Sequence, residues 1–112
     1  VADFNDPKLI KVVALDEKCR MQQVGEGWFS SLAEAPSQAV SLTCPCIMAA
    51  RHISCVVPDE RKAVAVKDTN SGVVTTKCPA SILTQHRDCI MWIDEPAASL
   101  LPADVVDRAK VA

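Results

Sequence analysis

The sequence predicts a β-rich fold, a small disulfide-stapled barrel or sandwich of short antiparallel strands with short helices. Its 112 residues are 49% hydrophobic and 23% charged, which suits one globular core. Six cysteines are frequent for this length, and their even number favours a disulfide framework. Short β-branched runs recur between turn-rich segments. An α+β arrangement of two pseudo-repeated halves is the alternative.

The first part of the chain contains one clear strand signal. Residues 9–15 form an apolar, β-branched stretch that predicts a strand. Residues 19–29 contain strand-like pieces interrupted by two glycines, which favour a bulge or a bend. Ser31 and Glu34 match a capping box, but Pro36 limits any helix there to a short one.

The second part of the chain contains two further signals. Residues 63–67 and 73–77 are β-prone runs around a turn-rich segment, and they predict a hairpin. After Pro102, apolar side chains recur at helical spacing, so we expect a short amphipathic helix whose apolar side docks on the core. These side chains are Leu101, Val105, Ala109 and Ala112.

An internal repeat organises the cysteines. Residues 40–57 and 74–91 align without a gap, and both contain the pattern C-P-x6-H-x2-C. The only two histidines, His52 and His86, occupy the same place in the two copies. Two copies are too few for a solenoid, so the sequence predicts a single domain over residues 1–112 with a pseudo-symmetric core.

All six cysteines are expected to form disulfides. The repeat favours one bridge within each copy and a long-range bridge between the remaining two cysteines, with cross-pairing between the copies as the main alternative. The chain starts without Met and without an apolar leader, which fits a mature secreted protein. We therefore expect an extracellular location. The favoured pairs are Cys44 with Cys55, Cys78 with Cys89, and Cys19 with Cys46.

Catalytic motifs are weak in this sequence. Motifs for serine hydrolases, zinc proteases and phosphate-binding loops are absent. His52 and His86 could act as acid and base in a small secreted nuclease, but 12 basic against 14 acidic residues do not favour nucleic-acid binding. We favour a structural interpretation, in which both histidines bond the backbone. The acidic pairs at 59–60 and 94–95 are interpreted as solvated loop tips.

Zinc binding is the sharpest alternative to disulfides. Zinc prefers cysteine and histidine ligands, and the first repeat copy offers four of them, Cys44, Cys46, His52 and Cys55. In this alternative the chain is an intracellular zinc-binding module. The spacing is not that of a common zinc finger, and the second copy lacks a fourth ligand. We therefore expect neither a metal nor another cofactor.

The sequence thus predicts a secreted, non-enzymatic interaction protein of the effector, elicitor or toxin kind that binds a host protein or another extracellular ligand. Trp28 and Phe29, beside glycines, are the candidate partner-binding residues. The apolar runs are too short to span a bilayer. A homodimer through an unpaired edge strand is compatible with the sequence.

Overall fold

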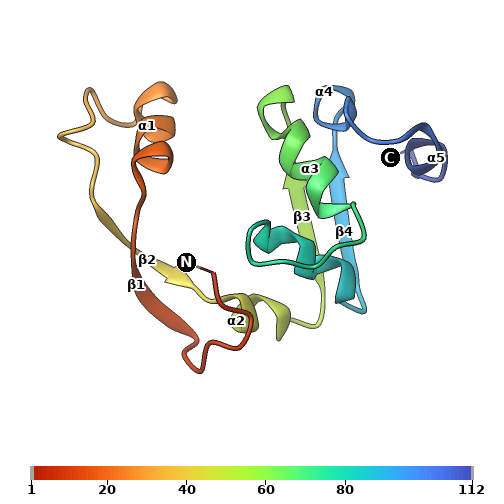
Figure 1. Cartoon of the computed structure of the whole chain (residues 1–112), viewed down its shortest axis with the longest axis horizontal. Helices are drawn as coiled ribbons and strands as arrows, with labels where there is room; N and C mark the ends of the chain where they lie inside the picture. Colours follow the sequence, from red (N-terminus) through yellow and green to blue (C-terminus); the bar gives the residue numbers. More distant parts are fainter. Residues whose placement is uncertain (1, 112) are drawn as a thin grey trace.

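The computed structural model describes residues 2–111 and contains two separate two-stranded sheets joined by short helices (Figure 1). The first sheet pairs β1 (Ile10–Ala14) with β2 (Gln38–Leu42) in antiparallel orientation. The second pairs β3 (Ile53–Val57) with β4 (Cys89–Ile93) in parallel. The helices are α1 (Glu17–Gly25), α2 (Cys44–Met48), α3 (Ala63–Thr69), α4 (Glu95–Ala98) and α5 (Ala103–Asp107), with two 3-10 helices, η1 (Glu60–Lys62) and η2 (Pro79–Gln85).

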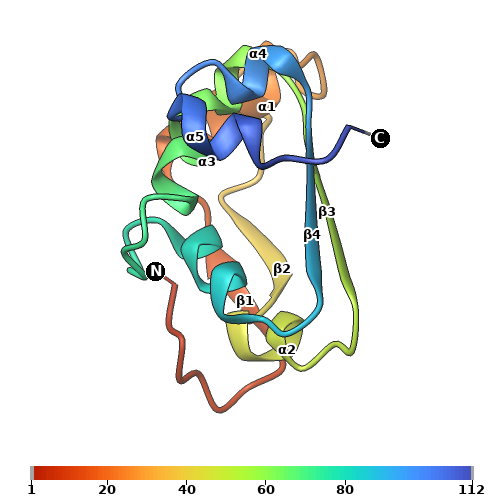
Figure 2. The ribbon, with the colours of Figure 1, turned by 90° about the vertical axis from the view of Figure 1, so that its right-hand side faces the viewer.

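The two sheets belong to two arms of the chain. One arm contains β1, β2 and α1, and the other contains β3 and β4 with the helices that follow them (Figure 1). Figure 2 shows α3 and η2 on one side of the β3–β4 pair. In both views α1 lies at the same end of the molecule as α3 and α4, so this end holds helices from both arms.

The core is small and lies around α3. Ala63, Val66 and Thr69 are buried at intervals of one helical turn, and Ala97 of α4 is buried as well. The buried hydroxyl of Ser81 completes this region, because it accepts the N–H of Thr75 at 2.9 Å and donates to the Cys78 carbonyl at 2.6 Å. The core therefore holds α3, α4 and η2 against the parallel pair.

The predicted disulfide-stapled barrel or sandwich is wrong. The sheets have two strands each and one of them is parallel, and all six cysteines, which lie within the described residues, carry free thiols. The two C-P dipeptides begin helices, with proline in the first turn of α2 and of η2. The repeat copies are therefore not the stapled hairpins on which the pairing rested, and Cys44, Cys46, Cys55, Cys78, Cys89 and Cys19 form no bridges.

Two of the predicted elements are confirmed and two are wrong. The strand over residues 9–15 is β1, and the carboxyl-terminal helix is α5, although Ala112 lies outside the described residues. Residues 19–29 were expected to be strand-like, but α1 forms there because the Asp16 carboxylate accepts the N–H of Cys19 at 2.7 Å. The hairpin expected over 63–77 is replaced by α3, because burial of one helix face outweighs the β propensity of its valines.

The repeat copies share a helix and a strand. The copy at 40–57 contains the end of β2, then α2 and β3. The copy at 74–91 opens with an isolated bridge between Thr75 and Cys78 instead of a strand, and continues into η2 and β4. The strands β3 and β4 then lie side by side in parallel, from the Ile53–Cys89 pair to the Val57–Ile93 pair.

Candidate functional site

The carboxyl ends of β3 and β4 each lead into an aspartate that caps a helix. Asp59 accepts the N–H of Arg61 at 2.9 Å at the start of η1, and Asp94 accepts the N–H of Ala97 at 2.9 Å at the start of α4. Because the strands are parallel, both loops lie at one edge of the sheet. Ligands of open α/β sheets bind at this edge.

The two loops are tied together by a strained residue. The N–H of Asp59 points at the carboxylate of Asp94, with 3.1 Å to each oxygen. Asp59 has φ 85 and ψ 142, a left-handed backbone conformation that glycine adopts far more easily than aspartate. Backbone strain of this kind costs about 1–3 kcal/mol and clusters at ligand-binding sites.

Arg61 and Lys62 give this edge its positive charge. The guanidinium of Arg61 bonds Asp59, with 3.0 Å from Nη2 to Oδ2 and 3.2 Å from Nε to Oδ1. This hydrogen bonding lowers the pKa of Asp59 below its usual value and raises the pKa of Arg61. Lys62 is half-buried and belongs to none of the ion pairs in the described part of the chain. Among the described residues, no carboxylate therefore pairs with its ammonium.

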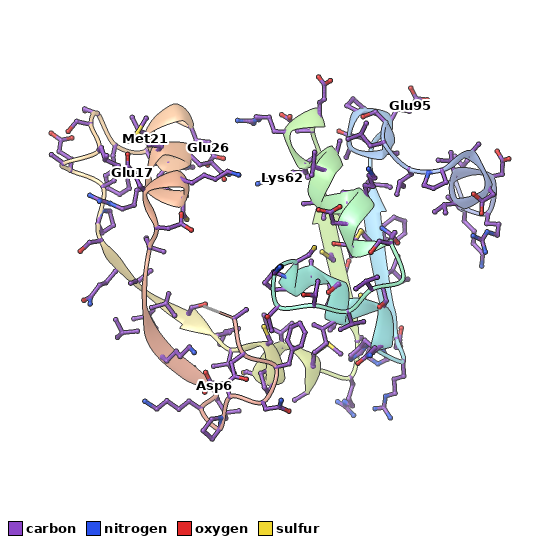
Figure 3. The ribbon with its side chains drawn as sticks, viewed as in Figure 1. Asp6, Glu17, Met21, Glu26, Lys62 and Glu95 are labelled. Carbon is purple, nitrogen blue, oxygen red and sulfur yellow. The ribbon has the colours of Figure 1, made fainter. Side chains whose placement is uncertain are left out.

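The end of α1 forms the opposite side of the site. Figure 3 shows Glu26, which follows α1, and Lys62 facing each other from the two arms of the chain. The amide of Gln22 donates to the Glu26 carboxylate at 2.7 Å and so orients it. Glu26 also makes a smaller, coulombic contribution to the raised pKa of Arg61. The site thus presents a cation on one side and a carboxylate on the other.

The loop after α1 is held by one arginine. Arg20 donates to the carbonyl of Leu32 at 2.6 Å and to that of Ala35 at 2.9 Å. These bonds fix the segment that contains the predicted partner-binding residues Trp28 and Phe29. The side chain of Trp28 is 71% exposed and that of Phe29 is half-buried. Their role in binding a partner stays a prediction.

The two histidines lie at the amino ends of β3 and β4, away from Lys62. His52 Nδ1 bonds the carboxylate of Asp88. His86 Nε2 donates to the Ala50 carbonyl at 2.8 Å, and its Nδ1 accepts the N–H of Asp88 at 3.0 Å. Both ring nitrogens of His86 therefore bond backbone groups. A five-residue strand separates the histidines from the carboxyl edge, a length of about 16 Å.

The zinc alternative has no support in the geometry. Within residues 2–111, no group of three or more His, Cys, Asp or Glu side chains is placed to hold a metal ion. Cys89 is half-buried, and its pKa is raised, first by burial and then by the neighbouring Cys55 and Asp88. Among the same residues, no helix has both the length and the apolar character that crossing a membrane requires.

The fold and the site define part of an α/β protein, with Asp59, Lys62 and Asp94 at the carboxyl ends of its parallel strands. No family model matches the chain. It is 41% identical over 103 residues to a glucosamine-6-phosphate deaminase of Exiguobacterium sibiricum, covering 88% of this chain and 40% of that protein. It is 36% identical over 113 residues to the enzyme of the same name from Thermoanaerobacter sp., covering 96% of this chain and 44% of the relative.

A solved structure agrees with these relatives. A monomeric glucosamine-6-phosphate deaminase of the NagB superfamily matches with a TM-score of 0.81 and 29% identity, over 88% of this chain and 39% of that one. The chain therefore spans about two fifths of the length of the proteins it resembles.

These matches overturn the predicted function. The relatives are named for an enzymatic activity, which contradicts a non-enzymatic effector, elicitor or toxin and both of its alternatives. The secreted, extracellular location is also wrong, because it rested on disulfides that do not form and on that same function. Nothing in the matches supports an extracellular protein partner.

Sequence reasoning missed the residues of the carboxyl edge. Asp94 directly follows one apolar run and Asp59 follows another after Pro58, and both positions are visible in the sequence. Interpreted as parallel strands, the two segments would have brought Asp59 and Asp94 to one edge. Because antiparallel strands were expected, Asp59 and Asp94 were not placed at the same edge.

Proposed function

We propose that this chain forms the phosphate-binding edge of an enzyme related to glucosamine-6-phosphate deaminases. The observation that carries the proposal is the half-buried residue Lys62 at the carboxyl edge of a parallel pair, whose ammonium forms no ion pair among the described residues. The whole activity, deamination of glucosamine 6-phosphate, is proposed from the relatives that bear that name.

The charges of the site suit such a substrate. Glucosamine 6-phosphate carries a phosphate dianion and, when protonated, an ammonium group. Lys62 offers a point charge to the phosphate, and Glu26 lies across from it as a partner for a cationic group. Arg61 is compensated by Asp59, so its main role is to hold the strained turn that positions Lys62.

The histidines have no place in this proposal. They hold the amino ends of the strands, and their hydrogen bonds are already satisfied by Asp88 and Ala50. We therefore assign His52 and His86 to the support of the parallel pair, not to proton transfer on the substrate.

Isothermal titration with glucosamine 6-phosphate tests the proposal, with glucosamine as the ligand that lacks phosphate. A charge-assisted bond is worth about 1.5–3 kcal/mol, so Lys62→Ala is expected to weaken binding of the phosphorylated sugar by about ten- to a hundredfold. Lys67→Ala, at an exposed lysine of α3, is the control and should bind like the wild type. Equal binding of glucosamine, or unchanged binding by Lys62→Ala, would contradict the proposal.

A further inference from the structure

Two arginines lie beside each other at the amino ends of β3 and β4. The register that pairs Ile53 with Cys89, continued two residues back along each strand, places Arg51 opposite Arg87. Neighbouring strands lie about 5 Å apart, so the two backbone positions are close. Both side chains are exposed. We call this pair the amino-edge arginines.

Hydrogen bonds on both sides hold these two positions together. On one side, His86 Nε2 donates to the Ala50 carbonyl at 2.8 Å. On the other side, His52 Nδ1 bonds the Asp88 carboxylate, and the Asp88 carbonyl accepts the N–H of Ile53 at 2.9 Å. The backbone of the amino-edge arginines is therefore kept in register beyond the ends of the strands.

No carboxylate compensates the amino-edge arginines. Neither of them belongs to an ion pair among residues 2–111. The nearest acidic residue in the sequence, Asp88, is already bonded to His52. Like charges that lie opposite each other in neighbouring strands repel. Two uncompensated guanidinium groups at one edge thus favour a ligand that brings two negative charges.

The chemistry of this pair favours phosphate. A guanidinium group presents its N–H donors in a fixed fork that matches the oxygens of phosphate. A phosphate monoester carries close to two negative charges at neutral pH, which match two arginines, whereas a single carboxylate matches one. A nucleic acid needs a longer row of cations, and the formal net charge of the chain is -2.

We propose that the amino-edge arginines bind a phosphate dianion, either free phosphate or a phosphate monoester. This site is distinct from the one proposed at Lys62, which follows the carboxyl ends of the same strands. Figures 1 and 2 show the amino ends of β3 and β4 near α2 and their carboxyl ends near α4. Five strand residues separate the two edges, a length of about 16 Å. The proposal therefore does not depend on the proposed function.

Titration of the isotope-labelled chain with inorganic phosphate, followed by amide NMR signals, tests the proposal. At low ionic strength and about pH 8, we expect saturable shifts at residues 50–53 and 86–89, with a Kd of about 1–10 mM for two exposed charge-assisted bonds. Methyl phosphate should shift the same signals, and the tighter of the two ligands identifies the source of the phosphate. Acetate, with a single charge, should bind at least about tenfold more weakly.

Matched variants separate this site from general attraction between the protein and anions. Arg51→Gln and Arg87→Gln each remove one guanidinium group, and each is expected to weaken phosphate binding about three- to tenfold. Arg51→Lys keeps the charge without the fork and should lose less affinity than Arg51→Gln. Arg108→Gln is the control, because this exposed arginine is already paired with Asp104, and it should bind phosphate like the wild type.

Three results would overturn the proposal. The first is the absence of saturable shifts at residues 50–53 and 86–89. The second is equal weakening of phosphate binding by Arg108→Gln, and the third is binding of acetate as tight as that of phosphate. Lys62→Ala is expected to leave the shifts at the amino edge unchanged, so this site and the proposed site at the carboxyl edge are tested separately.

Discussion

The backbone N–H of Asp59 donates to the carboxylate of Asp94, with 3.1 Å to each oxygen, and so joins the loops that leave β3 and β4. Asp94 also caps α4, and Asp59 caps η1. One carboxylate thereby fixes a helix start and the strained turn before Lys62. The position of the proposed phosphate-binding ammonium depends on this link between neighbouring parallel strands.

Removal of the Asp94 carboxylate is expected to destabilise the protein. Asp94→Ala leaves the N–H groups of Asp59 and Ala97 without their acceptor, and loss of such a cap costs about 0.5–2 kcal/mol. Urea unfolding followed by circular dichroism measures the change. Asp94→Asn should lose less stability than Asp94→Ala, because asparagine also caps helices. Asp104→Ala is the control, since its pair with Arg108 is exposed, and a loss as large there would contradict this role for Asp94.

The backbone of Asp59 predicts an unusual order of stabilities. With φ at 85, alanine keeps the strain and loses the bonds to Arg61, whereas glycine adopts this conformation freely. Asp59→Gly is therefore expected to be about 1 kcal/mol more stable than Asp59→Ala in the same urea experiment. At the adjacent Glu60, within η1, the order of stabilities should reverse, with Glu60→Ala more stable than Glu60→Gly. The same order at both positions would show that Asp59 is not strained.

The sequence predicted individual helices and strands better than the pairing of the strands. The strand at 9–15 was found because β-branched residues run without interruption, and the helix after Pro102 because its apolar residues recur at helical spacing. In contrast, α3 contains valines that favour strands, and its helical state depends on burial of Val66 against other elements. Whether β3 and β4 are parallel is a long-range property that no local pattern records.

The cysteines misled the interpretation for a physical reason. An even number of cysteines is equally compatible with bridges and with half-buried thiols, and composition alone does not separate the two. An oxidising location and an extracellular role follow only if such bridges form. The acidic pairs after β3 and β4 were visible but were interpreted without the edge that parallel strands create.

His86 is expected to matter for stability and not for ligand binding. His86→Ala removes the bonds to the Ala50 carbonyl and the Asp88 N–H, which together connect the amino ends of β3 and β4. The expected loss is about 1–2 kcal/mol in the free energy of unfolding. Binding of glucosamine 6-phosphate by the folded variant should stay within about twofold of the wild type, the opposite pattern to Lys62→Ala. Loss of binding with unchanged stability would assign His86 to the site instead.

The thiols give a prediction that can be read by mass spectrometry. All six cysteines are expected to react with iodoacetamide in unfolded protein that has never been reduced, because each is free. In the folded protein Cys89 should react more slowly than after unfolding, because burial and the neighbouring Cys55 raise its pKa and reduce its thiolate fraction. Its labelling should accelerate only above the pH of an ordinary thiol, about 8.5.

The raised pKa of Cys89 also has a consequence for stability. Folding disfavours the thiolate of Cys89, so its pKa is higher in the folded than in the unfolded protein. Below the unfolded-state pKa the thiol is protonated in both states, and its contribution to stability is complete. This contribution is lost as the pH rises through the folded-state pKa. Cys89→Ala should therefore flatten the decline in urea stability that begins above the pKa of an ordinary thiol, about 8.5. An identical decline in the wild type and in Cys89→Ala would show that burial does not penalise this thiolate.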